Sequence, residues 1–228
     1  MTDPASLVSA FDGVERVFLY ANHHGVHGVV DTARAAGVQR IVLMSSGSVV
    51  HPTSRGNAIT EAHRDIEATF ASATDLTVIP IRPLVLASNA LFWAGQIRSA
   101  GAVALYQPDA CTAPIHERDI AAVAVAALTG NDDTTDLLTG PAPLSQRDQV
   151  AAIAAATGKT IAVNTLTRPD ALTRFTRFMP SGQAQAVLRF LDDAAAGNSP
   201  ATDAVERILG RPAIPFETWA AEHAADFE

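Results

Sequence analysis

Three histidines lie close together near the start of the chain, at His23, His24 and His27. His24 and His27 are three residues apart and could share one face of a helix. A zinc site needs three or four ligands from Cys, His, Asp or Glu, and the residues around these histidines form no complete set. The sequence therefore predicts polar residues at a strand end here, and no metal site.

A second group of chemically useful side chains is the serine run Ser45, Ser46 and Ser48. A nucleophilic serine of a Ser-His-Asp hydrolase would sit in a G-x-S-x-G turn, and this run does not have that frame. Ser45 and Ser46 could instead form hydrogen bonds to a bound ligand, or they could be the solvated end of a strand. The residue types alone leave both interpretations open.

The elements that must position these residues form a strand–helix–strand unit over residues 14–50. Its two strands, 14–20 and 39–45, contain near-continuous apolar runs, which are typical of parallel strands buried on both faces. Apolar residues at helical spacing between them predict a helix that packs on the sheet and ends at Gly37. In open parallel sheets ligands bind at the carboxyl ends of the strands. We therefore expect Ala21 and Asn22 to lie beside Ser45 and Ser46.

The remaining pattern predicts one further strand in the same sheet, at 76–81, ended by Arg82 and Pro83. A helix over 60–73 precedes this strand. From Ser145 on the pattern is helix-rich, and Ser145 with Asp148 forms an N-terminal capping signal. The other expected helices cover residues 1–13, 88–99, 117–128, from Pro169, 181–196, from Ser199 with Pro200, and 216–227. Short strands are expected at 102–106, 136–139 and 160–166.

Composition limits the possible functions. The chain has 228 residues, 48% of them hydrophobic, and a formal net charge of −8. That acidity, without a cluster of Lys and Arg, argues against nucleic acid as a partner. Cys111 is the single cysteine, which fits a reducing compartment. The N-terminus does not read as a signal peptide, and no apolar run could span a bilayer, so we expect a cytoplasmic protein without a membrane partner.

Several segments resemble NmrA-like proteins, a branch of the atypical short-chain dehydrogenase/reductases. They are VERVFLYA, ARAAGVQRIVLMSS, AHRDIEATF, LTVIPIRP, TAPIHERDIAAVAVAALTG and LGRPAIPFETWAAEHAADF. The resemblance implies an α/β fold with a parallel, Rossmann-like three-layer sheet that binds NAD or NADP. It places an incomplete NAD(P)-binding core at 1–140 and a small helix-rich substrate lobe at 141–228, to which residues 84–111 also contribute.

The resemblance also implies that part of the family's core is absent from this sequence. A segment like TDPASLVSAFDGV lies between the third and fourth strands of the family, so we expect an N-terminally truncated sheet. The G-x-x-G-x-x-G fingerprint is not found, and Gly25 and Gly28 do not match it. Losing three hydrogen bonds to the cofactor's pyrophosphate would cost roughly 5–9 kcal/mol. A dissociation constant of about 1 μM would then become weaker than about 1 mM.

The same missing part would leave the strand 14–20 at an open edge. Val17, Phe18, Leu19 and Tyr20 would then present unpaired backbone and apolar side chains. We expect a homodimer, a partner that covers this edge, or poor solubility.

Most short-chain dehydrogenases use a Tyr-x-x-x-Lys pair. This chain lacks the pair, and NmrA-like proteins commonly lack it too. By resemblance His63 stands at the lysine position and Ile59 at the tyrosine position. His63 could bind the ribose or act as an acid or base, because its ordinary pKa is near neutrality. It could equally be a partly exposed helix residue paired with Glu67. We regard it as the best catalytic candidate.

The predicted site combines strand ends with residues of the lobe. Contacts to NAD or NADP are expected from Ala21, Asn22, Ser45, Ser46, His63 and Pro83. Substrate contacts are expected from Asn89, Trp93 and Tyr106, although Trp93, Tyr106 and Phe92 could be core residues. Two functions fit: a quinone- or azo-reductase-like enzyme for a small organic acceptor, or a non-catalytic dinucleotide- or ligand-sensing module. A truncated or mis-started relic is a third possibility. The sequence identifies neither the substrate nor the choice between NADH and NADPH.

Overall fold

A computed structural model describes residues 4–20, 25–54 and 56–228. The chain divides into two compact units, and each is described by itself. Unit 1 contains Met1–Pro83 and Ile120–Leu137, and unit 2 contains Leu84–Asp119 and Leu138–Glu228. No helix in the described part of the chain is long and apolar enough to cross a bilayer.

Unit 1 is built on a sheet with the strand order β1-β2-β3-β6. Its strands are β1 (Arg16–Tyr20), β2 (Arg40–Met44), β3 (Thr77–Pro83) and the short β6 (Leu137–Leu138). β2 pairs in parallel with both β1 and β3. The predicted α/β fold with adjacent parallel strands is therefore confirmed. β3 runs two residues further than expected, because Arg82 and Pro83 remain in the strand.

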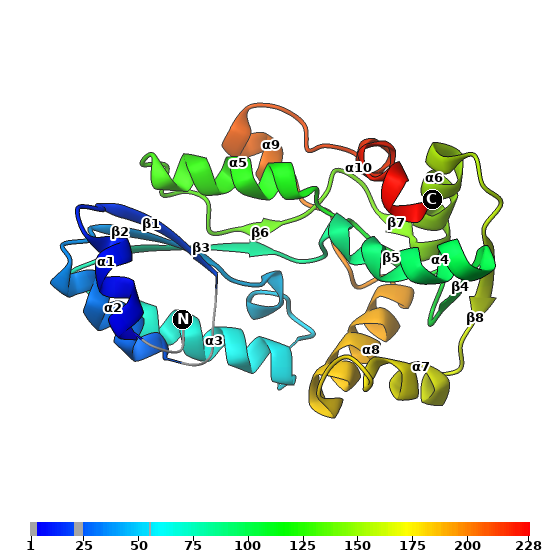
Figure 1. Cartoon of the computed structure of the whole chain (residues 1–228), viewed down its shortest axis with the longest axis horizontal. Helices are drawn as coiled ribbons and strands as arrows, with labels where there is room; N and C mark the ends of the chain where they lie inside the picture. The colour runs from blue at the N-terminus through cyan, green and yellow to red at the C-terminus, as the bar shows by residue number, and fades with distance from the viewer. Residues whose placement is uncertain (1–3, 21–24, 55) are drawn as a thin grey trace. The chain divides into compact units, whose positions relative to one another are not determined.

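Helices cover both faces of this sheet. Figure 1 shows α2 (Val26–Ala35) and α3 (Ala58–Ala71) on one face and α5 (Glu117–Leu128) on the other. The remaining elements are η1 (Pro4–Leu7), α1 (Val8–Phe11) and η2 (Gly47–Val49). α3 begins two residues earlier than predicted, because the side chain of Asn57 accepts the Thr60 backbone N–H at 2.8 Å and caps the helix.

The core of unit 1 explains the predicted apolar runs. Val42 and Leu43 are adjacent in β2 and both buried, so this strand is covered on both faces. The helical stripe of α2 is buried as expected, at Val26, Val29, Val30 and Ala33. These residues pack with side chains of α3 such as Ile66 and Phe70. This packing holds α3 against the sheet, beside the strand β2.

Unit 2 is mostly helical and contains two small sheets. β4 (Ala102–Leu105) pairs in parallel with β8 (Ala162–Thr165), and β5 (Cys111–Thr112) pairs antiparallel with β7 (Leu144–Ser145). The helices are η3 (Ala87–Trp93), α4 (Ala94–Ala100), α6 (Gln146–Thr157), α7 (Arg168–Phe175), α8 (Ser181–Ala195), α9 (Ala204–Leu209), α10 (Phe216–Glu222) and η4 (Ala224–Phe227). Trp219, Ile153 and Phe227 lie at the centre of its core.

Two predicted helix starts in the second half of the chain have opposite outcomes. The capping box at Ser145 is confirmed, since its side chain and that of Asp148 each bind the other residue's backbone N–H. The helix expected from Ser199 and Pro200 is wrong, because the next helix begins at Ala204 after Asp203. A local Ser-Pro signal is not sufficient to begin a helix, because short helices are stable mainly where an apolar face packs against the protein.

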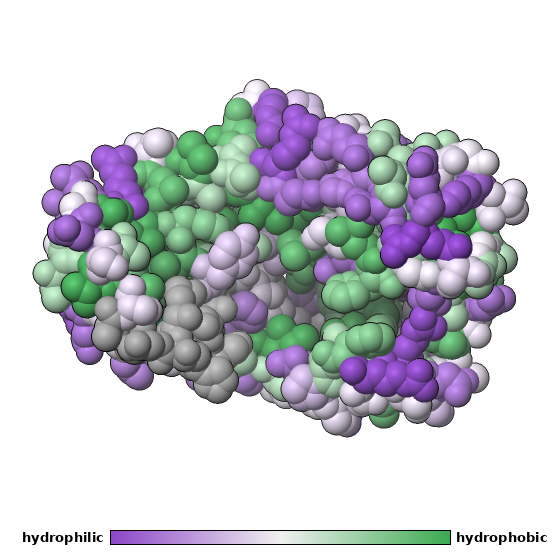
Figure 2. Space-filling model, viewed as in Figure 1, coloured by the Kyte–Doolittle hydropathy of each residue, from purple (hydrophilic) through white to green (hydrophobic). Residues whose placement is uncertain are grey.

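The edge of the unit 1 sheet differs from expectation in one respect. β1 is the end strand of the four described. However, Leu19 is only 7% exposed and Val17 packs against the same core, whereas Tyr20 is 67% exposed. The alternation of a strand turns Leu19 inward, so the prediction that all four side chains would be exposed is wrong. Figure 2 shows hydrophobic side chains over α5 as well, where Val125 is 57% exposed.

Candidate functional site

The two serines after β2 have different environments. Ser45 is buried, its backbone N–H donates to the Ile81 carbonyl at 2.9 Å, and its hydroxyl donates to Glu67 at 2.5 Å. Ser46 is half-buried, and its Oγ accepts the backbone N–H of Ser48 at 3.2 Å, which caps η2. Ser45 is therefore committed to the protein interior, and Ser46 is the more accessible of the two.

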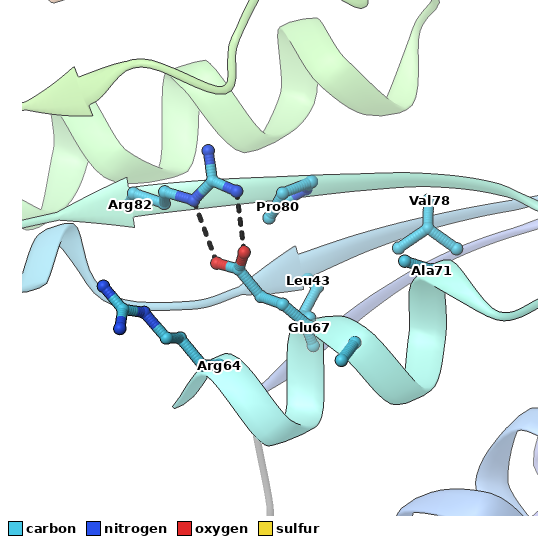
Figure 3. A pocket seen from close by; sticks show the side chains of 8 residues that line it. Leu43, Arg64, Glu67, Ala71, Val78, Pro80 and Arg82 are labelled. Atoms are coloured by element: carbon cyan, nitrogen blue, oxygen red, sulfur yellow. Dashed lines mark hydrogen bonds and ion pairs between the residues drawn. The ribbon is translucent and has the colours of Figure 1, made fainter. Parts of the chain in front are cut away.

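Glu67 and Arg82 form a two-point ion pair that sequence reasoning missed (Figure 3). Arg82 donates from Nε to Oε1 at 2.9 Å and from Nη2 to Oε2 at 2.7 Å. Its Nη1 donates to the carbonyl of Thr135 at 2.7 Å. The two side chains are only 14% and 16% exposed. The available signal was Arg82 itself, since a charge in an apolar strand needs a partner.

His63 lies on α3, one helical turn before Glu67, and is half-buried. Because Ser45 contacts α3 through Glu67, His63 and Ser45 belong to the same face of the sheet. Pro83 is the buried last residue of β3. Ala21 and Asn22 lie outside the described residues. The cofactor role of all six positions stays a prediction.

A pocket of about 300 Å³ lies along the flank of α3, within unit 1. Leu43, Val78 and Pro80 of the strands form apolar walls, and Arg64, Glu67 and Arg82 form a polar end (Figure 3). Arg64 is held by Glu61 at 3.2 Å and by the Val49 carbonyl at 3.0 Å. Of the predicted cofactor contacts that the structure describes, which are Ser45, Ser46, His63 and Pro83, none lines this pocket.

The three predicted substrate contacts belong to unit 2. Asn89 is exposed on η3, and Trp93 packs partly buried against the core of the unit. Phe92, by contrast, is 76% exposed. Tyr106 is half-buried after β4. The structure thus gives Trp93 a packing role, while substrate binding by Asn89, Trp93 and Tyr106 stays a prediction.

Asp192 on α8 organises the polar residues around Tyr106. It accepts hydrogen bonds from the Tyr106 hydroxyl at 2.6 Å, from Gln107 Nε2 at 3.1 Å and from Arg168 Nε at 3.4 Å. Burial would raise the pKa of Asp192, but these hydrogen bonds outweigh it and hold the pKa below its ordinary value. Burial and the Asp192 carboxylate raise the pKa of Tyr106. Tyr106 therefore stays protonated and directs its proton at Asp192.

Gln107 in this cluster has a backbone φ of +49°, a value that non-glycine residues rarely adopt. The side chain of Gln146 donates to the carbonyls of both Tyr106 and Gln107, at 2.7 and 2.8 Å. These bonds and the contact to Asp192 hold the strained turn in place. Nothing in the sequence signals Asp192 or this turn as special.

A second cluster of ionisable groups lies within unit 2, where the C-terminal segment contacts Glu117. His223 contacts Glu117 at 2.9 Å and Asp226 at 2.8 Å, and its ring stacks on Trp219 at 4.5 Å. Burial would lower the pKa of His223, but the two carboxylates outweigh it and raise the pKa. Among the described residues no group of His, Cys, Asp or Glu could hold a metal ion. His27 is exposed, and His23 and His24 lie outside the described residues.

Comparison with known proteins finds solved structures with the same fold. A solved structure of the NADPH-dependent quinone oxidoreductase QOR2 from Escherichia coli, complexed with NADPH, superposes with a TM-score of 0.77. The match covers 97% of this chain and 80% of that one at 20% identity. NmrA, a negative transcriptional regulator, superposes with a TM-score of 0.65 at 12% identity, over 96% of this chain and 77% of that one. These likenesses establish the fold.

Two curated proteins align along almost the whole chain. The (4-alkanoyl-5-oxo-2,5-dihydrofuran-3-yl)methyl phosphate reductase of Streptomyces griseus is 35% identical over 99% of this chain and 81% of its own length. The NAD(P)H azoreductase of Xenophilus azovorans is 30% identical over 100% and 82%. A family model described as NAD(P)H-binding matches residues 1–131. The chain is thus a member of the NAD(P)H-binding family, in agreement with the resemblance of its segments to NmrA-like atypical short-chain dehydrogenase/reductases.

Proposed function

We propose that this chain is an NAD(P)H-dependent reductase of a small organic acceptor. The observation that supports it most strongly is the alignment with two reductases, at 35% and 30% identity, along nearly all of the chain. One of them is an azoreductase and the other reduces a furanone that carries a phosphate. An azo or quinone compound is our first candidate for the acceptor, and a phosphorylated unsaturated lactone is the second.

Two residues of unit 1, Ser46 and His63, support binding of the nicotinamide half of the cofactor. Ser46 is accessible at the carboxyl end of β2, and His63 lies on the helix that follows. When bound, NAD(P)H supplies the hydride. Ser46 would hold the ribose by a hydrogen bond. His63 would bind the ribose or give a proton to the reduced acceptor, in place of the tyrosine that the chain lacks.

The pyrophosphate half of the cofactor has no glycine-rich turn in this sequence. For that reason we keep the expectation that the 228-residue chain binds NADPH and NADH with dissociation constants weaker than about 1 mM. Isothermal titration with each cofactor measures this. A low micromolar constant would show that another segment of the chain binds the phosphates.

The activity is tested with dichlorophenolindophenol and menadione as acceptors. Reduction is followed at the absorbance of dichlorophenolindophenol, so that millimolar NADPH or NADH can be used. We expect acceptor reduction that needs both protein and cofactor. Cofactor binding without reduction of these acceptors or of an azo dye or phosphorylated lactone would contradict the proposal and favour the sensing function.

A further inference from the structure

One carboxylate joins three elements of unit 1. Glu67 of α3 accepts from Ser45, the residue that follows β2, and from Arg82 in β3. Arg82 extends the network to the carbonyl of Thr135. Glu67 Oε1 takes two donors and Oε2 takes one, so the carboxylate is fixed in position and rotation. Figure 3 shows the two bonds from Arg82.

A gain in stability is a weak explanation for the polar residues of this network. Apolar side chains of Leu43, Val78 and Pro80 line the same pocket as this network. A buried ion pair contributes about as much to folding as a well-packed apolar group of the same size, or less. Hydrogen bonds are directional, so they hold the elements that they join in one defined arrangement, whereas apolar packing allows several. The network therefore indicates a requirement for placement of the elements that it joins.

Ser46 and His63, the two accessible residues of the proposed site, are each close to a residue of this network. Ser46 directly follows Ser45 in the chain. His63 is four residues before Glu67 on α3, so both side chains lie on the same side of that helix. A shift of α3 against β2 would change the distance between Ser46 and His63. Misplacement of reacting groups by about 1 Å can lower a rate about 100-fold.

We propose that Ser45, Glu67 and Arg82 are positioning residues, which set the spacing of Ser46 and His63 for the nicotinamide end of the cofactor. The inference rests on the proposed function. The three residues act through their neighbours and do not touch the reacting atoms. Ser45 in particular has its hydroxyl proton directed at Glu67 and is buried, which suits this role.

The kinetic test compares Ser45→Ala and Glu67→Gln with a variant of an exposed ion pair elsewhere in unit 1. Arg34 on α2 donates to Oδ1 of Asp75 from Nε at 3.0 Å and from Nη2 at 2.7 Å, and Asp75 lies just before β3. We expect Ser45→Ala and Glu67→Gln to lower kcat/KM for NADPH at least about 10-fold. Asp75→Asn should leave it unchanged. Ser45→Thr, which keeps the hydroxyl, should recover most of the loss.

A second measurement needs no turnover. In Arg82→Lys the backbone amide of Ser46 and the ring signals of His63 should both shift in NMR spectra, although Arg82 is adjacent to neither in sequence. Asp75→Asn should shift neither signal. Unmoved signals in Arg82→Lys would overturn the inference, even if the wild type is an active reductase. A wild type that reduces no acceptor overturns the proposed function, while shifted signals would still show that the network influences both Ser46 and His63.

If the kinetic variants lose stability, the thermal midpoint of each is measured beside its rate. A loss of kcat/KM in Ser45→Ala that Ser45→Thr does not recover would overturn the inference. So would equal losses in Glu67→Gln and Asp75→Asn.

Discussion

The hydroxyl of Tyr106 donates a hydrogen bond to Oδ1 of Asp192 across 2.6 Å, and this contact ties the end of β4 to α8. The proton of the phenol therefore points at a carboxylate of the same unit. A tyrosine in this arrangement is a poor proton donor for a substrate, because the raised pKa and the bound carboxylate both hold its proton.

Tyr106→Phe is predicted to leave the proposed reductase activity nearly intact. Removal of the hydroxyl should lower the free energy of unfolding by about 1–2 kcal/mol, since Asp192 loses one of its donors. Its pH–rate profile should match that of the wild type. If turnover by Tyr106→Phe were instead slower by about 100-fold or more, the hydroxyl would take part in the reaction.

His63→Ala tests the best catalytic candidate. General acid–base catalysis contributes about 10²–10⁴-fold to a rate, so we expect kcat/KM for acceptor reduction to fall by about 100-fold or more. His27→Ala is the matched control, because His27 is an exposed histidine on α2. Equal rates for both variants and the wild type would exclude a catalytic role for His63.

The contacts of His223 predict a loss of stability at alkaline pH. Its folded pKa is raised, so its contribution is fully present below the ordinary value of about 6.5 and is lost as pH rises through the raised pKa. Its partner Glu117 has a lowered pKa, because hydrogen bonds and the nearby histidines outweigh burial, and that contribution is lost as pH falls into the acid range.

Thermal unfolding between about pH 5 and pH 9 measures the effect. The wild type should lose stability across the alkaline half of this range, and His223→Gln should show a flatter profile there. Parallel profiles for the two proteins would mean that the histidine does not titrate in the way its two carboxylate contacts imply.

Self-association is predicted from two exposed features of unit 1. Tyr20 is 67% exposed on the edge strand β1, and Val125 is 57% exposed on α5. An edge strand offers unpaired backbone groups to another chain. Sedimentation should show a dimer or larger species for the wild type, and Tyr20→Lys with Val125→Glu should reduce it. A stable monomer of the unaltered chain would contradict this prediction.

Ser145→Ala tests the capping box of α6. The Ser145 side chain accepts the Asp148 backbone N–H at 3.0 Å, and loss of such a cap costs about 1 kcal/mol. The lowered pKa of Asp148, caused first by its hydrogen bond from the Ser145 side chain, should rise in this variant. Ser99→Ala, on the exposed end of α4, should change unfolding by denaturant far less.

Local patterns predicted the elements of unit 1 well because its strands are buried on both faces. Burial explains both apolar patterns, and the structure confirms it. The buried residues include Val42 and Leu43 of the strand and Val29 and Ala33 of the helix. The absence of a Tyr-x-x-x-Lys pair is equally visible in the sequence. These features depend on neighbours a few residues away.

The polar network was not predictable in the same way. Glu67 and Arg82 are 15 residues apart, and Tyr106 and Asp192 are 86 apart, so their pairing depends on tertiary packing. Ile66 and Phe70 are buried on the inner face of α3, but nothing in the local sequence pattern gave a reason to expect Glu67 beside them. The edge strand was mispredicted for a different reason. β1 has no further neighbouring strand in the described sheet, but Leu19 points to the face of the sheet that the core covers and is buried there.

Each unit is assembled from two separate stretches of the chain, which passes between the units at residues 83–84, 119–120 and 137–138. No single contiguous fragment therefore contains either unit complete and alone. A gene fragment that stops at residue 137 would hold all of unit 1, but it would also carry 84–119 without the rest of the core around Ile97 and Val103. Fragment expression should consequently yield aggregated material, and a protease that nicks one connection should leave the pieces associated.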